Sequence, residues 1–341
     1  MQYLVITPRN LEDVILNELQ ERNIKKEKQE YRKILITFND NPQELLTLRS
    51  PDDILIFLKN IKDVQHQIGK LRNIADELEK IDLSEAVDVC RKIRTISQKV
   101  TFAITVSIIG ERKFTQERLK KLAAKIIARK GYSFKKEGKP DIDVHLLIEN
   151  DNVLFGIRLG KEPLYKRDYK RHSLPASLKA NIAYALVKLA RVTKNDIVLD
   201  PMCGVGTIAI EAAFIGAKAY GYDINPKAIQ LAKKNMRRSK KEIVFEQRDA
   251  THTGLEKNSI NKIVTNLPFE KQAHTQSNKN FLELFFKEML RILKAEGTIV
   301  LLTNHVEQIR NLIKKTKLQI IHEREISLFG LSPHILVIKK A

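Results

Sequence analysis

A glycine-rich turn between an apolar strand and a helix is the first group of residues that could do chemistry. Gly204, Gly206 and Ala209 lie in DIVLDPMCGVGTIAIEAA at the spacing G-x-G-x-x-G/A, which is typical of turns that bind a dinucleotide. Asp223 ends the next expected strand, roughly 20 residues on, where an acid can bind ribose hydroxyls. These residues predict a nucleotide cofactor, and by themselves they fit NAD.

An acid that precedes the glycines favours S-adenosylmethionine over NAD. Asp200 stands at the end of the first strand, where its carboxylate can orient the turn and attract a cation. S-adenosylmethionine carries an ammonium and a sulfonium group, whereas the pyrophosphate of NAD would be repelled by the carboxylate. Asp249, just after the third expected strand, adds a polar group where an adenine amine would lie.

The second group of candidate residues is the stretch TNLPFE, which follows the apolar run SINKIV. This run should be a strand. Asn266, Leu267, Pro268 and Phe269 then hold an amide and an aromatic ring close together, because the proline ring locks the backbone angle φ. The strand therefore ends in a stiff turn that presents one amide and one ring.

The elements around both groups alternate between short apolar strands and helices from Pro175 onward. Strands separated by helices predict a parallel, doubly wound sheet. Only SLFGLSP separates LQIIHEREI from HILVIKK, and a parallel crossover needs about a dozen residues. The last two strands should therefore form an antiparallel hairpin, which closes the sheet differently from dinucleotide-binding folds.

The part of the chain before these elements reads as two units and a linker. Residues 1–65 alternate strand and helix signals and predict a small α+β domain. Residues 66–160 predict a second domain, in which 142–148 and 153–159 show period-2 alternation and should form a hairpin with one buried face. Residues 161–174 are polar and basic and predict a linker before the domain at 175–341.

Composition indicates a globular protein with a polyanionic partner. The chain has 341 residues, of which 43% are hydrophobic, and a net charge of +20 from 61 Lys and Arg against 41 Asp and Glu. Such a bias fits nucleic acid. The two cysteines, Cys90 and Cys203, form no CxxC pair, so we expect neither a disulfide framework nor a metal site. The first 20 residues fit neither a signal peptide nor a membrane anchor, and we expect a cytoplasmic protein.

Three sequence motifs resemble a known family. DPMCGVGT resembles the D-P-x-C-G-x-G-T loop of class I RNA methyltransferases, and NLPF resembles their [DNS]-[LP]-P-[YFW] catalytic loop. TFAITVSIIGERKF and PDIDVHLLIENDNVLFGIRL resemble the THUMP RNA-binding domain. The order of parts is similar to that of the tRNA guanine-N2 methyltransferases, and the Asn-Leu-Pro-Phe version resembles the branch that acts on guanosine 6 of the acceptor stem. This chain has Glu270 where the family usually has Gly.

The resemblance implies an α/β fold, a substrate and a set of site residues. It implies a Rossmann-like class I methyltransferase domain with an antiparallel terminal strand, preceded by ferredoxin-like and THUMP domains. It implies S-adenosylmethionine as cofactor, tRNA as partner and a monomer. Asn266, Leu267, Pro268 and Phe269 are then catalytic: the Asn266 oxygen and the Leu267 carbonyl accept the amine hydrogens of a flipped guanine, and Phe269 stacks on it. The expected cofactor residues are Asp200, Pro201, Cys203, Gly204, Gly206, Thr207, Asp223, Ile224, Asp249, Ala250 and Asn266, with Pro175, Ser177 and Leu178 from the preceding helix. Arg112, Lys113, Lys166, Arg167, Lys170 and Arg171 are the expected RNA contacts.

Four alternatives remain open from the sequence. An NAD-dependent dehydrogenase would share the glycine turn, but it leaves the basic charge and the first 160 residues unexplained. A non-catalytic RNA-binding protein would not need both loops intact. Methylation at C5 of cytosine or uracil needs a cysteine nucleophile near the target, and neither Cys90 nor Cys203 is placed for that role. The target could also be guanosine 10 of tRNA or a guanosine of ribosomal RNA.

Overall fold

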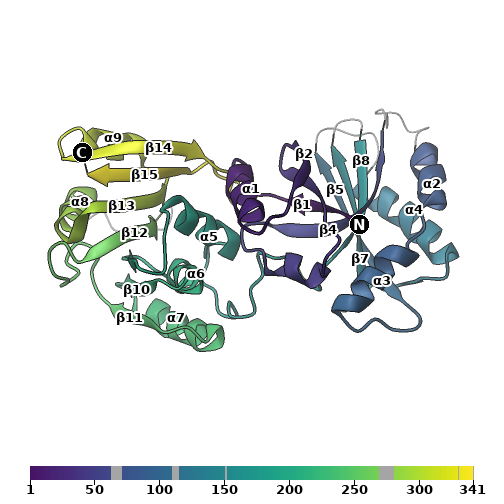
Figure 1. Ribbon diagram of the computed structural model, residues 1–341, viewed down its shortest axis with the longest axis horizontal. Coiled ribbons are helices and arrows are strands. Elements are labelled where there is room, and N and C mark those ends of the chain that lie inside the picture. Colours follow the sequence, from purple (N-terminus) through teal and green to yellow (C-terminus); the bar gives the residue numbers. More distant parts are fainter. Residues whose placement is uncertain (63–70, 110–114, 150–151, 269–279, 329, 341) are drawn as a thin grey trace. The chain divides into compact units, whose positions relative to one another are not determined.

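The computed structural model describes residues 1–62, 71–109, 115–149, 152–268, 280–328 and 330–340 (Figure 1). The chain divides into two compact units. The first unit comprises Met1–Thr7 and Leu16–Leu164, and the second comprises Pro8–Ile15 and Tyr165–Ala341. The division falls within the expected basic linker, most of which belongs to the second unit.

The first unit is built on one eight-stranded sheet with the order β2-β3-β1-β4-β8-β7-β5-β6. Its strands are β1 (Gln2–Ile6), β2 (Lys26–Glu30), β3 (Lys33–Thr37), β4 (Asp53–Ile61), β5 (Thr101–Ile109), β6 (Ser133–Phe134), β7 (Ile142–Glu149) and β8 (Asn152–Arg158). Its helical elements are most of α1 (Glu12–Glu21), the 3-10 helix η1 (Pro42–Thr47), α2 (Leu71–Lys80), α3 (Ser84–Ile93) and α4 (Gln116–Arg129). Because β4 pairs with β8, the sheet continues across the expected domain boundary at residue 65.

The hairpin expected between residues 142 and 159 is confirmed, since β7 and β8 pair antiparallel. The expectation that only one of its faces is buried is wrong. Ile142 and Val144 are buried on one face, and Leu154 packs with Leu4 and Leu55 in a small apolar cluster of its own. Both strands lie inside the sheet rather than at its edge, so apolar neighbours are available on both faces.

The second unit has a seven-stranded sheet with the order β11-β10-β9-β12-β13-β15-β14. Its strands are β9 (Ile197–Asp200), β10 (Lys218–Asp223), β11 (Ile243–Gln247), β12 (Ile260–Asn266), β13 (Leu293–Thr303), β14 (Leu318–Glu325) and β15 (His334–Lys340). The first five strands in the order are parallel, while β15 runs antiparallel to β13 and β14. The predicted parallel sheet with an antiparallel terminal hairpin is therefore confirmed.

Two layers of helices cover this second sheet. They are α5 (Ala180–Leu189), α6 (Thr207–Ile215), α7 (Pro226–Ser239), α8 (Phe281–Ile292) and α9 (Val306–Ile313). Buried residues of α5, α6 and α7 share one hydrophobic cluster, and those of α8 and α9 share another. Two separate clusters fit a doubly wound sheet that is covered on both faces. In the part of the chain that the structure describes, no helix has the length and apolar character needed to cross a membrane.

Candidate active site

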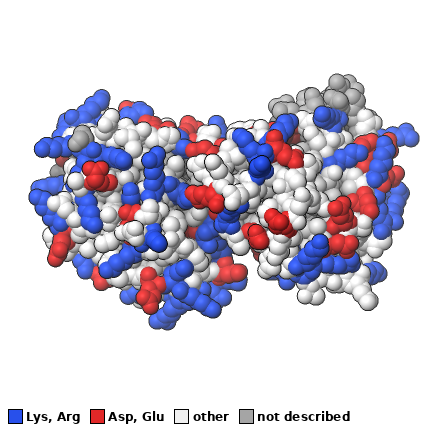
Figure 2. Space-filling view, in the orientation of Figure 1, with Lys and Arg blue, Asp and Glu red and all other residues white. Residues whose placement is uncertain are grey.

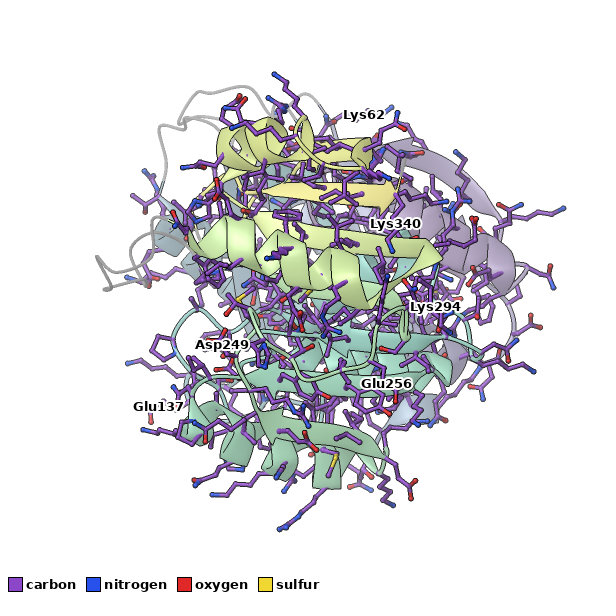
Figure 3. The ribbon with its side chains drawn as sticks, turned by 90° about the vertical axis from the view of Figure 1, so that its left-hand side faces the viewer. Lys62, Glu137, Asp249, Glu256, Lys294 and Lys340 are labelled. Carbon is purple, nitrogen blue, oxygen red and sulfur yellow. The ribbon has the colours of Figure 1, made fainter. Side chains whose placement is uncertain are left out.

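A pocket of about 290 Å³ opens in the second unit beside the carboxyl ends of β9, β10 and β12. Its lining residues are Leu174, Pro175, Ala176, Ser177, Leu178, Asp200, Met202, Cys203, Gly204, Val205, Thr207, Ile208, Asp223, Ile224, Asn266 and Pro268. In Figure 3, Asp249, which follows β11, lies toward one end of the strands, whereas Lys294, at the start of β13, and Lys340, at the end of the antiparallel β15, lie toward the other end. The fold thus brings most of the residues predicted to bind the cofactor together at one edge of the sheet.

The glycine turn needs its glycines for two different reasons. Gly204 has φ of +52°, and a Cβ added there would meet no atom within 4 Å, so its backbone is open to the pocket. Gly206 has φ of +83° at the start of α6, where an added Cβ would lie 2.6 Å from the Phe245 ring. Gly204 therefore keeps the approach to a ligand open, and Gly206 allows the turn to pack on β11.

Asp223 ties the end of β10 to the glycine turn. Its Oδ2 accepts a hydrogen bond of 2.8 Å from the Gly204 backbone N–H, and its Oδ1 accepts one of 2.9 Å from Asn225. A carboxylate can accept about four hydrogen bonds, so capacity remains for two ribose hydroxyls. The carboxylate can orient the turn and bind a ligand at the same time.

Asp200 is a buried carboxylate at the end of β9, with only 1% of its surface exposed. Its Oδ1 accepts hydrogen bonds from the Thr265 hydroxyl at 2.7 Å and from the Met202 N–H at 3.3 Å. Burial raises the pKa of Asp200 to about 7, and the charge of Asp223 adds to that rise. A cation in the pocket would favour the ionised form. Sequence reasoning missed Thr265. The signal that could have found it is a threonine directly before Asn266, at the end of the strand β12.

Asn266 ends β12 with its side chain at the pocket. Its Oδ1 is buried and accepts no hydrogen bond from the described residues. Leaving such an oxygen unsatisfied costs about 1–3 kcal/mol, so this position suits a donor supplied by a ligand. Leu267 anchors the turn, because its N–H donates to the Leu302 carbonyl at 2.9 Å and its side chain is buried.

The rest of the turn reaches the pocket rim. Pro268 lines the pocket, and its carbonyl oxygen lies 3.3 Å from Nε2 of His305, in the loop that follows β13. His305 is a second residue near the turn that sequence reasoning did not single out. Phe269 lies outside the described residues, so its expected stacking role stays a prediction.

The segment 165–178 packs on the second unit instead of forming a solvated linker, and its last five residues, 174–178, form a wall of the pocket. Tyr169 donates a hydrogen bond of 2.7 Å to the fully buried Glu211, and the Arg167 guanidinium lies 3.5 Å from the same carboxylate. Lys170 donates to the Leu178 carbonyl; burial lowers the pKa of Lys170 to about 8, although Glu211 raises it. This geometry does not support the expectation that Arg167 and Lys170 reach phosphates, because α6 supplies a buried acid for them.

Asn235 joins this wall to the glycine turn. The residue is fully buried in α7. Its Oδ1 accepts from the His172 N–H at 3.1 Å, and its Nδ2 donates to the carbonyls of His172 at 3.0 Å and Val205 at 3.1 Å. Sequence reasoning missed Asn235, although an amide among the apolar residues of an amphipathic helix was a signal.

The helix expected to carry Pro175, Ser177 and Leu178 starts later than predicted. Helix α5 begins at Ala180, and 175–178 form a turn in which Ala176 has φ of +57°. The Ser177 hydroxyl accepts from the Leu174 N–H at 2.8 Å and stabilises this turn. The proline and this serine favour a turn over a helix, so the three residues reach the pocket from a loop.

The remaining predicted residues lie in several environments. Asp249 is exposed outside the lining of the pocket and accepts hydrogen bonds from Thr251, while Ala250 and Pro201 are buried. Lys166 and Arg171 are exposed, and Arg171 lies 3.6 Å from Asp168. Arg112 and Lys113 fall outside the described residues. Burial raises the pKa of both cysteine thiols, and no group of three or more potential metal ligands occurs within the described ranges.

Comparisons with known proteins found matches to the part of the chain that contains the pocket and matches to nearly the whole chain. Residues 167–333 match the family model described as RMKL-like, methyltransferase domain. Over 180 residues the chain is 32% identical to the tRNA (guanine(6)-N(2))-methyltransferase THUMP3 of Bos taurus, a match that covers 48% of this chain and 35% of that protein. The chain spans about a third to a half of the length of the first curated relatives it matches.

Two further matches extend over nearly the full chain. The tRNA (guanine(6)-N2)-methyltransferase of Archaeoglobus fulgidus is 22% identical over 98% of this chain and 91% of its own. The crystal structure of TrmN from Thermus thermophilus superimposes over all of both chains with a TM-score of 0.84 at 22% identity, so the two share a fold.

Proposed function

We propose that this protein uses S-adenosylmethionine to methylate the exocyclic N2 amine of a guanosine in tRNA. Residues 167–333 match the family model of an RMKL-like methyltransferase domain, and a protein with a similar fold was solved in complex with SAH. The observation that carries the proposal is the buried Oδ1 of Asn266, which accepts no hydrogen bond from the described residues and lies at the same pocket as the glycine turn. The names of the curated relatives support the target amine.

The pocket residues fit S-adenosylmethionine. Asp200 offers a carboxylate for a cationic group, Asp223 keeps acceptor capacity for ribose hydroxyls, and the space in front of Gly204 leaves room for the ligand. When bound, the cofactor supplies a methyl group on a positively charged sulfur. The expected NAD alternative is weaker, since Asp200 would repel a pyrophosphate in this pocket.

The catalytic task of Asn266 follows from the chemistry of an aromatic amine. The nitrogen lone pair is delocalised into the guanine ring, so the amine is a poor nucleophile. An acceptor aimed at an amine hydrogen draws the nitrogen toward tetrahedral geometry and stabilises the positive charge that grows on it. Asn266 Oδ1 is such an acceptor, and the Leu267 carbonyl is proposed as the second. The new N–C bond forms as the S–C bond breaks, and the nitrogen then releases a proton to water.

The finer assignments belong to the same proposal. We place the target at guanosine 6 of the acceptor stem, reached by flipping the base out of the helix onto Phe269. A target at guanosine 10 or in ribosomal RNA would use the same pocket chemistry. Methylation of a pyrimidine C5 is disfavoured, because burial raises the pKa of Cys203 and Cys90 and both stay thiols. We expect a cytoplasmic monomer.

A tRNA transcript with inosine in place of guanosine 6 tests the proposal sharply. Inosine lacks the 2-amino group but keeps the rest of the base. Incubation with S-adenosylmethionine and mass spectrometry of the nucleosides should show N2-methylguanosine from the normal transcript and none from the inosine transcript. Loss of methylation only with inosine at position 10 would move the target there. Absence of N2-methylguanosine from all transcripts would overturn the proposed function.

A further inference from the structure

The outer face of α7 carries an unusual concentration of positive charge. In α7 and the two residues that follow it, Pro226 to Lys241, the chain has seven basic residues and no acid: Lys227, Lys233, Lys234, Arg237, Arg238, Lys240 and Lys241. Ala228, Ile229 and Ala232 are buried on the inner face of the helix, and the cations project from the other side. Blue side chains gather over α7 in Figure 2.

These cations lack the acidic partners that some cations on other helices have. Arg91 of α3 pairs with Asp88, Arg291 of α8 with Glu288, and Arg310 of α9 with Glu307, each three residues away on its own helix. No ion pair within the described parts of the chain involves an exposed cation of α7. Lys241 differs from the others, since its ammonium lies 5.1 Å from the centre of the Phe214 ring.

Helix stability alone does not account for this composition. Like charges three or four residues apart, such as Lys233 with Arg237 and Lys234 with Arg238, destabilise a helix by about 0.2–0.5 kcal/mol a pair. The helix dipole favours cations in the last turn, which explains Arg237 and Arg238 but not the two lysines in the middle. These cations repel one another, which lowers the stability of the helix, and they neutralise no acidic side chains of the described parts of the protein. Such a surface suits a polyanionic ligand.

The position of α7 relates this surface to the pocket. Asp223 and Ile224 line the pocket, and Pro226 starts the helix two residues later. A helix of 14 residues is about 21 Å long. Its cations therefore extend from near the rim of the pocket across the surface of the second unit, over a length that faces several phosphates of a nucleic acid backbone.

We propose that the outer face of α7 binds the phosphate backbone of the RNA whose base enters the pocket. The proposal rests on the proposed function and adds a contact surface in the catalytic unit. Duplex RNA is held mainly through phosphates, 2′-hydroxyls and shape, so the face needs positive charge and no base-specific groups. Its contribution is sequence-independent and weakens with salt, because bound phosphates release counterions.

The test compares two full-length variants that remove equal charge from the same unit. The first is Lys234→Gln with Arg237→Gln and Arg238→Gln. The matched control is Lys314→Gln with Lys315→Gln and Lys317→Gln, three exposed cations after α9. The probe is an unmodified tRNA transcript, and its Kd is measured by fluorescence anisotropy between about 50 and 200 mM KCl. Calorimetry with S-adenosylmethionine and thermal unfolding show whether each variant is folded.

We expect the α7 variant to raise the Kd for tRNA about tenfold or more. The slope of log Kd against log salt concentration should fall by about 2–3, because each of the three lost phosphate contacts contributes about 0.7–0.9 to it. The control should change the Kd by less than about twofold, and both variants should bind S-adenosylmethionine as the wild type does. Equal losses in the two variants would mean that only net charge matters, and no loss in the α7 variant would exclude the site; either result overturns the proposal.

The methylation assay and the tRNA binding curves together distinguish failure of this proposal from failure of the proposed function. If the wild type forms N2-methylguanosine while the α7 variant binds tRNA normally, only the α7 proposal fails. If the wild type forms no N2-methylguanosine, the proposed function fails, and the binding curves still decide whether α7 contacts RNA.

Discussion

The two units differ in how they use charge. The first unit has 29 Lys and Arg against 23 Asp and Glu, a net charge of +6, and the second has 32 against 18, a net charge of +14. The residues expected to contact RNA lie between Arg112 and Arg171, in the second expected domain and the basic linker. The larger excess of positive charge lies in the unit with the pocket, and half of that excess lies between Lys227 and Lys241, outside that range. Charge in the first unit is largely balanced by its own acids.

In the first unit, an ion cluster within the sheet shows basic side chains paired with acids of the same unit. Arg158 of β8 lies 2.7 Å from Asp53 of β4 and also contacts Asp143 of β7, which is 3.3 Å from His145. Burial raises the pKa of Asp53 despite Arg158. Burial also pushes up the pKa of Asp143, but hydrogen bonding and charge from His145 and the charge of Arg158 hold it below its usual value. The cluster joins three adjacent strands, so we expect a structural role.

The largest predicted effect is loss of stability on breaking that cluster. Arg158→Met should lower the free energy of unfolding by about 3–5 kcal/mol, because the buried carboxylate of Asp53 and the partly buried carboxylate of Asp143 lose their cation. Denaturant unfolding followed by circular dichroism measures the change. Arg158→Lys keeps the charge and should lose less. Binding of S-adenosylmethionine to the folded protein should not change; a stable variant with weakened cofactor binding would contradict the contrast between the units.

The next effect is catalytic and belongs to the second unit. Asn266→Ala should lower kcat about 10²- to 10³-fold, the usual result of removing one preorganised polar group, while the Kd for S-adenosylmethionine stays within about threefold. Asn261→Ala is a matched control at the other end of β12, where the amide accepts from Ile197 and Lys294. It should affect stability but not kcat. Wild-type turnover in Asn266→Ala would exclude the catalytic assignment.

A smaller effect concerns cofactor affinity. Asp223→Ala should weaken S-adenosylmethionine binding at least about tenfold in calorimetry, since hydrogen bonds to charged groups contribute about 1.5–3 kcal/mol each and Gly204 also loses its acceptor. Asp249→Ala is the comparison, because that side chain is exposed outside the pocket lining. An equal loss in both variants would show that Asp249 reaches the ligand, whereas no loss in Asp223→Ala would remove Asp223 from the site.

The smallest predicted effect is a dependence of cofactor affinity on pH. The pKa of Asp200 is raised to about 7 by burial, so affinity for a cationic ligand should rise several-fold between about pH 6 and pH 7.5 as the carboxylate ionises. Between about pH 3.8, the ordinary pKa of an aspartate, and about pH 7, the folded protein keeps the Asp200 proton whereas the unfolded chain has lost it. Without the cation, the contribution of Asp200 to stability therefore falls as pH rises through that window. Asp200→Asn should flatten both dependences; an unchanged pH profile would exclude Asp200 as their source.

Local patterns were sufficient for the architecture and for much of the site. Gly204, Gly206 and Asp223 could be located because a strand, a turn and a second strand place them by spacing alone. The short connection before β15 was sufficient to predict the antiparallel hairpin. The turn at Asn266–Pro268 could be predicted because proline restricts the backbone regardless of its surroundings.

The sequence by itself determined which residues stand at the ends of β9, β10 and β12, because the parallel arrangement of strands follows from local periodicity. Only the tertiary structure decided which side chains those ends meet. Arg167 lies near the buried Glu211, and the Thr265 hydroxyl donates a hydrogen bond to Asp200. Asn235 bonds to His172, 63 positions away in the sequence, and to Val205, 30 positions away. Burial and partners depend on packing between segments far apart in the chain, and neither charge nor spacing reveals whether a lysine or arginine faces a phosphate or an acid inside the protein.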